Sequence, residues 1–484
     1  MLDTDTIRRK VLELALQGNL TEQLILDGTA EELYNLIQEE KKVLIKERKS
    51  KIMPIANDEI PFVIPNNWKW VRLGELSESI QYGYNAPAKK SGRIKMVRIS
   101  DIQDNEVLWD TVPYCDIDEA SIHIYLLKKN DILFARTGGT VGKSYMVCEI
   151  PQEAIYAGYL IRTRYSKHLC AKYMKYFMES GLYWRQLLKG TTATAQPNCN
   201  GQSLSKMILP LPPISEQYRI VDRIDQIFEV LGNIDKLQSQ YSDNVDILKR
   251  KLIDAAILGK LTKQLPENGT AEDLYAKIQA QKVKLMQEGK IKKEKVLPEI
   301  TEGEVPFNIP SNWKWVRLGD ISAKISSGNT PAGGKKSNAY VEKGYSFFRE
   351  QNIYNDGIHE EGLVYITEEV LKTRENSTVM PMDILLNITG GSIGRCALVS
   401  DDFTKGSINQ HILIIRMIDP RLRFYIHTCI CSPFIQKYIK GNTVGDKDGF
   451  SAGRCKNMLI PLPPLEEQRR IVSVINEVLT YAVI

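Results

Sequence analysis

The sequence predicts an α+β fold: two globular, mostly-β domains joined by long antiparallel coiled-coil helices, with a pseudo-twofold internal repeat. Three observations predict it. Several segments recur in the same order in the two halves of the chain. Each half contains β-branched and aromatic runs that alternate with Gly, Asn, Asp and Pro turns, and a long central stretch has apolar residues at heptad spacing. A chain of 484 residues also exceeds one ordinary core, so we expect at least two domains.

The internal repeat is the strongest of these signals. Four pairs of segments carry it: WKWVRLGEL (68–76) with WKWVRLGDI (313–321), LPLPPISEQYRIVDRID (209–225) with IPLPPLEEQRRIVSVIN (460–476), DILFARTGGTVGK (131–143) with DILLNITGGSIGR (383–395), and KVLELALQGNLTEQL (10–24) with KLIDAAILGKLTKQL (251–265). The rest of the two interiors is hard to align. The repeat therefore predicts a shared frame around two different interiors.

The repeat divides the chain into five parts. In chain order they are the N-terminal half of a split helical region (1–60), a first mostly-β domain (61–213), a central helical spacer (214–300), a second mostly-β domain (301–464) and a C-terminal helix that pairs with the central helix (465–484).

The central helix is predicted from about residue 216 to residue 257, a length of roughly 60 Å. Its heptad seam consists of Ile220, Ile224, Ile227, Leu231, Ile234, Gln238, Tyr241, Val245, Leu248, Leu252 and Ala255, with Gln238 as the one polar position. The repeat assigns the start of a second seam to Ile471, Ile475 and Val478 and its finish to Ile7, Val11 and Leu14. We therefore expect the central helix to pack antiparallel against both chain ends. Two tandem domains that never pair would instead leave three apolar stripes exposed.

The charged stretches at 30–51 and 271–295 are interpreted as solvated helices or connectors, because their Glu and Lys residues fall at helical spacing.

The net charge is +5, yet residues 66–209 hold 19 Lys/Arg against 13 Asp/Glu, and residues 311–460 hold 19 against 15. The positive charge thus lies in two separate blocks, as expected if both approach phosphate.

Neither a metal site nor a membrane segment is expected. The eight cysteines form no CxxC pair and the five histidines no HxxxH or CxxH group, so Cys429 and Cys431, the one close pair, are interpreted as packing thiols. There is no apolar run of membrane-spanning length, and the N-terminus lacks the pattern of a signal peptide. We expect a cytoplasmic protein.

Each interior is predicted to be mostly β with a helical end. The expected strands are IKMVRISDI (94–102), DILFARTGG (131–139) and YLIRTRY (159–165) in the first, and YSFFREQNI (345–353), DILLNITGG (383–391) and HILIIRMI (411–418) in the second. Helices are expected at 171–188 and 423–439.

A polar Gly-Gly turn follows a strand in both copies and lies next to a basic residue. A Walker phosphate loop is excluded, because only three residues separate Gly138 from Gly142 and the second copy has Arg395 where Lys143 stands. Such a turn lets backbone N–H groups approach a phosphate or a base edge. A tight hairpin without a ligand explains the turn equally well.

Catalytic motifs are missing from both interiors. The Pro-Pro pairs differ from the adenine methyltransferase signature, because Leu211 and Leu462 replace the polar residue that would hold the amino group of adenine. There is also no glycine-rich cofactor loop after a strand, no HExxH, no GxSxG and no compact acidic cluster. These absences disfavour a self-contained methyltransferase or nuclease.

Taken together, the duplicated motifs resemble the specificity subunits of Type I restriction-modification enzymes. The resemblance covers essentially the whole chain and rests on the four pairs above, on GTAEELY (28–34) with GTAEDLY (269–275), and on openings of target-recognition type at 82–114 and 327–353. It implies two target-recognition domains that each read one half of a bipartite, asymmetric site in double-stranded DNA. Helical spacers then set the distance between the halves.

The resemblance also implies partners, and it places the chemistry in them. Two methyltransferase (M) subunits would dock on the helical frame and use S-adenosylmethionine, and nuclease/translocase (R) subunits would use ATP and Mg. No catalytic residue, metal or cofactor would belong to this chain. A duplicated scaffold that binds only protein is the main alternative.

Positions that match the family's target-recognition regions are the candidates for DNA contact. In the first domain they are Lys89, Lys90, Arg93, Arg98, Arg136, Thr137, Gly138, Gly139 and Lys143. In the second domain they are Lys335, Lys336, Arg349, Gln351, Asn387, Thr389, Gly390 and Arg395. Arg, Asn and Gln can contact base edges in bidentate fashion, whereas Lys more often contacts phosphate. Because Arg136 aligns with Ile388, we expect the two turns to contact DNA differently.

Overall fold

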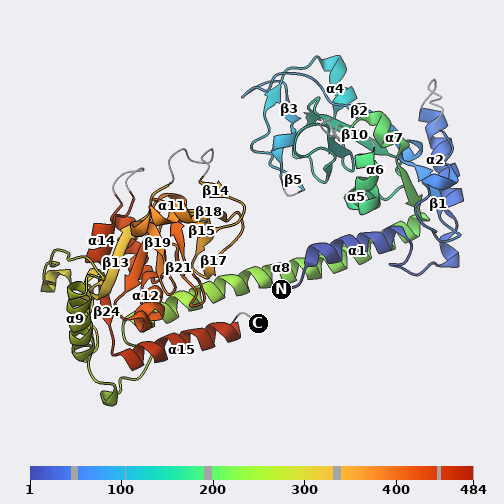
Figure 1. The fold of residues 1–484 in the computed structure, drawn as a ribbon. Coiled ribbons are helices and arrows are strands. Elements are labelled where there is room, and N and C mark those ends of the chain that lie inside the picture. Colours follow the sequence, from blue (N-terminus) through green and yellow to red (C-terminus); the bar gives the residue numbers. More distant parts are fainter. Residues whose placement is uncertain (45–52, 104, 190–198, 331–338, 444–448, 483–484) are drawn as a thin grey trace. The chain divides into compact units, whose positions relative to one another are not determined.

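The structure is a computed structural model, and it describes residues 1–44, 53–103, 105–189, 199–330, 339–443 and 449–482 (Figure 1). The chain forms two compact units, Met1–Ser239 and Gln240–Ile484. Their boundary falls inside one long helix, α8 (Ile214–Ile257), which agrees closely with the helix predicted at 216–257. Each unit mixes helices with small sheets, so the predicted α+β class with two domains is confirmed. The five-part division remains a prediction.

Unit 1 contains a four-stranded antiparallel sheet in the order β2-β10-β7-β8, a smaller sheet in the order β6-β3-β9, and the strand pairs β1-β11 and β4-β5. Its strands are β1 (Lys69–Arg72), β2 (Ser77–Tyr82), β3 (Ile94–Val97), β4 (Ile102–Gln103), β5 (Glu106–Val107), β6 (Tyr114–Cys115), β7 (Ile132–Ala135), β8 (Ser144–Met146), β9 (Ala154–Tyr156), β10 (Leu160–Tyr165) and β11 (Ile208–Leu211). Its helices besides α8 are α1 (Thr4–Leu16), α2 (Ala30–Leu44), α3 (Leu73–Leu76), α4 (Glu119–Tyr125), α5 (Ala171–Glu179), α6 (Gly181–Lys189) and α7 (Gly201–Lys206).

Unit 2 repeats the four-stranded sheet as β13-β23-β20-β21 and the border pair as β12-β24, but it adds a five-stranded sheet, β14-β18-β15-β22-β19, and the pair β16-β17. Its strands are β12 (Lys314–Arg317), β13 (Ser322–Ser327), β14 (Tyr340–Val341), β15 (Tyr345–Phe348), β16 (Ile353–Tyr354), β17 (Gly357–Ile358), β18 (Val364–Ile366), β19 (Thr378–Val379), β20 (Ile384–Asn387), β21 (Cys396–Leu398), β22 (Gly406–Ile408), β23 (Ile412–Met417) and β24 (Leu459–Leu462). Its helices are α9 (Ala271–Gln287), α10 (Leu318–Ile321), α11 (Glu368–Lys372), α12 (Arg423–Ile430), α13 (Pro433–Gly441), α14 (Ala452–Asn457) and α15 (Leu465–Ala482).

The predicted helical ends of the interiors each form two helices rather than one. In unit 2, the hydroxyl of Ser432 accepts a hydrogen bond from the N–H of Ile435, and Pro433 occupies the first turn, so a new helix starts there. In unit 1, the hydroxyl of Ser180 accepts a bond from the N–H of Tyr183 at 3.3 Å. A serine cap in the middle of the apolar pattern therefore separates α5 from α6 and α12 from α13.

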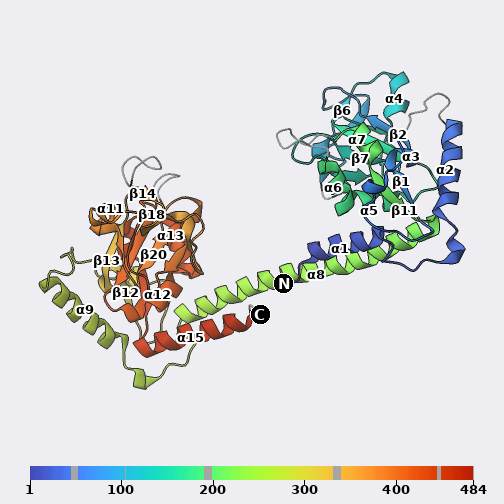
Figure 2. The ribbon, with the colours of Figure 1, turned by 45° about the vertical axis from the view of Figure 1, so that its right-hand side comes forward.

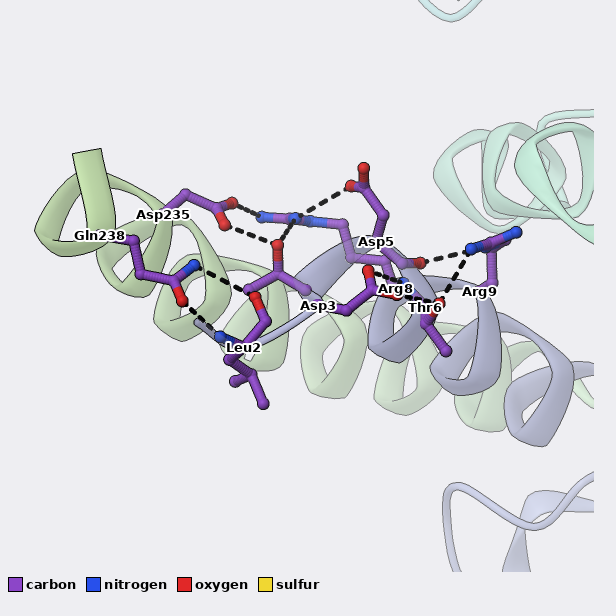
Figure 3. A network of polar contacts seen from close by, with 9 residues as sticks. Leu2, Asp3, Asp5, Thr6, Arg8, Arg9, Asp235 and Gln238 are labelled. Atoms are coloured by element: carbon purple, nitrogen blue, oxygen red, sulfur yellow. Dashed lines mark hydrogen bonds and ion pairs between the residues drawn. The ribbon is translucent and has the colours of Figure 1, made fainter. Parts of the chain in front are cut away.

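In unit 1, α1 runs antiparallel beside the first part of α8 (Figures 1 and 2). The backbone N–H of Leu2 donates to Gln238 at 2.5 Å, whereas Thr21, beyond the other end of α1, donates to Glu216 at 3.2 Å. Between these points, the carboxylate of Asp235 accepts hydrogen bonds from Thr4 and Arg8, both at 2.6 Å (Figure 3). Gln238, the polar position of the seam, thus accepts a hydrogen bond from the backbone of the N-terminal segment that pairs with α8.

In unit 2, α15 runs antiparallel beside the second part of α8. The hydroxyl of Tyr241 donates to the carbonyl of Ala482 at 2.6 Å, and Thr262, beyond the end of α8, donates to Glu467 at 3.1 Å. The antiparallel pairing of the central helix with each terminal helix therefore holds within each unit.

The residues of the heptad seam are buried near the two ends of α8 and exposed in its middle. Ile220, Ile224 and Leu231 are buried, whereas Tyr241 and Leu248 are exposed. Toward the end of α8 the buried positions are Ile253, Ala256 and Ile257, one residue beyond the predicted Leu252 and Ala255. Ala256 and Ile257 belong to the hydrophobic core of unit 2, so the end of α8 packs against the core of the domain as well as against α15.

A buried carboxylate joins three repeat motifs in each unit. The indole Nε1 of Trp68 and the amide of Gln23 donate to Glu216, at 2.7 and 2.9 Å. In unit 2, Trp313 and Gln264 donate to Glu467 in the same way, at 3.1 and 2.5 Å, and both glutamates are completely buried.

The charged helices α2 and α9 each bury one face, which corrects their interpretation as merely solvated. Ala30 and Ile37 on α2, like Ala271 and Ile278 on α9, are almost fully buried. On α2 the ammonium of Lys41 also donates to the carbonyls that follow β1, at 2.8 and 3.0 Å. The many charges obscured a short apolar stripe in the sequence.

Among the described residues, no helix is both long and apolar enough to cross a membrane.

Candidate nucleic-acid interface

The two Gly-Gly turns form hairpin loops of identical hydrogen-bonding pattern at the ends of equivalent strands. In unit 1 the loop 136–143 connects β7 to β8, and in unit 2 the loop 388–395 connects β20 to β21. The N–H of Ala135 donates to the carbonyl of Lys143 at 3.0 Å, and that of Asn387 donates to the carbonyl of Arg395 at 2.8 Å. The two loops therefore share one backbone structure, as the sequence match predicted.

Two glycines in each loop have different tasks. Gly138 and Gly390 have φ of +85° and +67° and would meet no atom within 4 Å if they carried a Cβ, so they face open space. Gly142 and Gly394 have φ of +80° and +88°, and a Cβ on Gly142 would lie 2.1 Å from the side chain of Leu187. The first glycine exposes the backbone at the tip, while the second lets the base of the loop pack on the helices beneath it.

In unit 1 the loop carries exposed Thr137, Gly138, Gly139 and Lys143. The guanidinium of Arg136 lies 4.9 Å above the ring of Tyr82, and its Nε is buried without a hydrogen-bond partner among the described residues. A cation held over an aromatic face beside an exposed loop is suited to bind an anionic or polar edge.

Lys143 also faces a cavity of about 1140 Å³. Its lining includes Ile99 and Gln103 from the segment after β3, and Asp5 and Arg8 from α1. The cavity thus brings the hairpin loop, the turn near Arg98 and the frame helix to one place.

Lys89 and Arg93 of unit 1 are engaged with carboxylates. Lys89 pairs with Asp116, and the hydrogen bond from this ammonium holds the pKa of Asp116 below its usual value. Arg93 pairs with Glu119 at 2.5 Å and lowers the pKa of that carboxyl in the same way. These pairs are exposed and hence readily exchanged for phosphate contacts. Lys90 is exposed beside them.

Arg98 has a different environment, because its partner is buried. Its Nε and Nη2 donate to the carboxylate of Asp101 at 3.0 and 2.7 Å, and the backbone N–H of Arg98 donates to the same group at 2.9 Å. Asp101 is 1% exposed. Arg98 therefore fixes the turn that follows β3.

In unit 2 the basic residue of the loop packs against a pair of stacked rings. The guanidinium of Arg395 lies 4.4 Å from the ring centroid of Tyr354, and this ring stacks on His359 at 4.1 Å. This contact holds the guanidinium beside the loop, and a guanidinium is suited to bidentate contact with a base edge.

Asn387 departs from its expected role as a DNA-contacting side chain. It is completely buried at the end of β20, and its Nδ2 donates to the backbone carbonyl of Glu350 at 2.8 Å. This bond ties the hairpin to the turn that carries Arg349 and Gln351. Asn387 was misjudged because a strand end that is exposed in an isolated hairpin is covered here by a second segment.

Arg349 and Gln351 flank that turn. Arg349 donates through Nη2 to the carbonyl of Gly362 at 2.5 Å, and its Nε is buried without a partner among the described residues. Gln351 is exposed. Both therefore lie in the segment that the Asn387 bond attaches to the loop.

At the loop tip of unit 2, Gly390 is exposed and Thr389 contacts the ring Nδ1 of His411 at 2.7 Å. Lys335 and Lys336 lie outside the described residues, so their predicted role stays a prediction.

Sequence reasoning missed the side chains that hold the loops. Tyr82, Tyr354, His359 and His411 support the candidate residues from neighbouring strands and turns. No motif signals them, because Tyr82, Tyr354 and His411 lie far along the chain from the loop residues they contact, and His359 contacts the loop only through Tyr354. Among the described residues, no group of three or more His, Cys, Asp or Glu side chains could hold a metal ion.

The fold and the duplicated loops agree with comparisons to known proteins. A family model described as "Type I restriction modification DNA specificity domain" matches twice, at residues 65–240 and 310–481. The chain is 25% identical to the specificity subunit of the Type I restriction enzyme EcoAI from Escherichia coli, over 98% of this chain and 88% of that protein. It is also 25% identical to the EcoEI specificity subunit from the same organism, over 97% and 88%.

Two solved structures share the fold. One chain, from a structure titled as the basis of complex assembly and conformational transition of the type I R-M system, matches with a TM-score of 0.60 and 18% identity, covering 87% of this chain and 93% of that one. The HsdS subunit from Thermoanaerobacter tengcongensis matches with a TM-score of 0.50 and 19% identity, covering 88% and 92%. Because the family model matches both units over most of their length, the chain belongs to the Type I restriction-modification DNA specificity family.

Proposed function

We propose that this chain is the DNA sequence-recognition subunit of a Type I restriction-modification complex, and that each unit reads one half of a bipartite, asymmetric site. One observation carries the proposal. The two hairpin loops have the same backbone pattern but different side chains: Arg136 and Lys143 in one, and Arg395 in the other, where a buried Ile388 stands in place of Arg136. A shared backbone with different side chains is what two readers of different half-sites need.

The proposed contacts divide by chemistry. Exposed backbone around Gly138 and Gly390, together with exposed lysines, is suited to phosphate oxygens, which position a protein but do not specify sequence. The stacked guanidiniums of Arg136 and Arg395 are suited to base edges in the major groove, above all those of guanine.

In this proposal α8 is the spacer between the two readers, and it forms an antiparallel coiled coil with α1 and α15. The frame docks two methyltransferase subunits, and nuclease subunits join for cleavage. S-adenosylmethionine, ATP and Mg belong to those partners, and this chain performs no chemistry. The missing catalytic motifs and the repeated motifs concentrated in the frame support this division.

Methylation-sensitive sequencing of host DNA, with and without this gene, tests the proposal. We expect methylated adenines in one split sequence whose two halves differ, present only when the gene is present. Unchanged methylation, or a continuous palindromic site, would contradict it. A scaffold that binds only protein would leave the assembled complex without salt-dependent DNA binding.

A further inference from the structure

Equivalent positions of the two units hold different ionisable pairs beneath the hairpin loops. The helices α5 and α12 correspond, since the hydroxyls of Tyr173 and Tyr425 donate to the backbone carbonyls of Pro210 and Pro461, both at 2.7 Å. This correspondence aligns Lys175 with His427 and Glu179 with Cys431.

In unit 1 these positions form an ordinary ion pair. The Nζ of Lys175 lies 2.5 Å from Oε1 of Glu179, and Lys175 is almost fully buried. A lysine in this place requires a permanent negative charge one helical turn away, because an unpaired buried ammonium is costly.

In unit 2 an imidazole and a thiol replace that pair. The Sγ of Cys431 lies 3.7 Å from Nε2 of His427, and this ring nitrogen is 2.9 Å from the carbonyl oxygen of Cys396. The pKa of Cys431 lies well below that of an ordinary thiol, first because the Cys396 thiol donates a hydrogen bond to its sulfur and then because His427 does. Cys431 therefore occupies the position that the carboxylate of Glu179 has in unit 1.

Cationic side chains surround the sulfur on its open side. Cys431 lines a cavity of about 770 Å³ together with Arg250 from α8 and Lys437 and Lys440 from α13, and among the described residues none of those that line it is acidic. Lys249 of α8 also lowers the pKa of the thiol. Cys431 is partly exposed, whereas Cys396 is fully buried behind it.

We propose that Cys431 is a reactive thiolate that small hydroperoxides oxidise, and that the product then closes a disulfide with Cys396. The thiolate sulfur attacks one peroxide oxygen and the O–O bond breaks, which gives a sulfenic acid and an alkoxide that takes up a proton. The sulfur of Cys396 then attacks the sulfenic sulfur; the S–S bond forms, the S–O bond breaks and water leaves. Two thiols and one hydroperoxide thus yield one disulfide, one alcohol and one water.

The location gives this chemistry a structural consequence. Cys396 directly follows Arg395 of the hairpin loop, and Cys431 caps α12 just before α13 begins. A disulfide between them would tie the base of the loop covalently to the helices beneath it. Unit 1 lacks such a tie, since Ser144 aligns with Cys396.

Alkylation of the full chain with iodoacetamide tests the thiolate, with each cysteine followed by peptide mass spectrometry. Dividing each rate by its own plateau at high pH removes differences in access. Exposed Cys148 is the internal reference, and an unperturbed thiol keeps only about one hundredth of its plateau rate at pH 6.5. We expect Cys431 to keep most of its plateau rate there. A profile of Cys431 that follows Cys148 would overturn the proposal.

Hydrogen peroxide tests the second step, and a matched variant controls for folding. Peroxide should yield a peptide in which Cys396 is linked to Cys431. The double substitution His427→Lys with Cys431→Glu installs the pair that unit 1 already accommodates, so it should fold and lose the cross-link, while Cys148→Ser should keep it. Peroxide-treated wild type that carries Cys431 only as sulfinic acid, without the cross-link, would contradict the proposed disulfide.

Discussion

The indole Nε1 of Trp68 donates a hydrogen bond to Oε2 of Glu216 at 2.7 Å, although 148 residues separate them in the chain. The bond connects the two borders of the first interior, and Trp313 and Glu467 repeat it in unit 2. Because neither residue belongs to a variable interior, the interior can change while its borders stay closed. The frame therefore tolerates different readers.

Loss of this bond should destabilise unit 1. Trp68→Phe removes the donor and leaves a completely buried carboxylate with fewer partners, which should lower the free energy of unfolding by about 1.5–3 kcal/mol. Trp315→Phe is the control, because its Nε1 has no hydrogen-bond partner among the described residues. Urea unfolding measures both; equal losses would show that the ring and not the hydrogen bond matters.

Gly18 should not tolerate a side chain. It has φ of +74°, and a Cβ would lie 2.4 Å from Cγ of Pro65, so Gly18→Ala should cost more than about 1 kcal/mol. Gly232 in the middle of α8 would meet no atom within 4 Å, and Gly232→Ala should stabilise by about 0.5–1 kcal/mol through helix propensity. Opposite shifts in the thermal midpoint are expected. A neutral Gly18→Ala would refute the packing argument.

Substitutions in the two loops should affect different halves of the DNA site. Arg136→Ala should weaken binding of the assembled complex by about 1–3 kcal/mol and relax the preference in one half only. Arg395→Ala should do the same in the other half. Lys277→Ala, an exposed cation on α9, serves as the control. Binding to sites mutated one base pair at a time measures the preference; relaxation of both halves by one substitution would contradict separate reading.

Lys324 should make stability depend on pH. Burial, followed by repulsion from Arg416, lowers its pKa to about 8 from the ordinary value of 10.5. Between these values the unfolded chain binds the proton more strongly, so this residue's contribution to stability rises as pH rises. The difference in unfolding midpoint between wild type and Lys324→Met should therefore shrink from pH 8 to pH 10.5. A difference that stays constant would exclude the shifted pKa.

The helical frame and its loops could be predicted from the sequence because their segments occur twice. The extent of α8 follows from its heptad pattern, and the paired loops follow from matched segments in the two units. The unmatched interiors were harder. The five-stranded sheet of unit 2 consists of strands as short as Thr378–Val379, which are set by distant partners rather than by a local pattern.

Within the candidate site, the sequence predicted residue types better than environments. Arg395 was expected, but the ring of Tyr354 beneath it was not, because contacts across a sheet leave no spacing signal. Asn387 was predicted to contact DNA, and its side chain is completely buried and bonded to the turn at Glu350. Burial of a polar strand end depends on tertiary packing that one sequence does not reveal.

The central claim is that the two units read separate halves of one site, and an exchange of interiors tests it most directly. Residues 77–205 are replaced by the corresponding interior of another specificity subunit, and the methylated sequence is determined with the same methyltransferase partner. The account predicts that one half of the recognised sequence changes while the other half stays the same. An unchanged recognition sequence from a folded, active complex would contradict it.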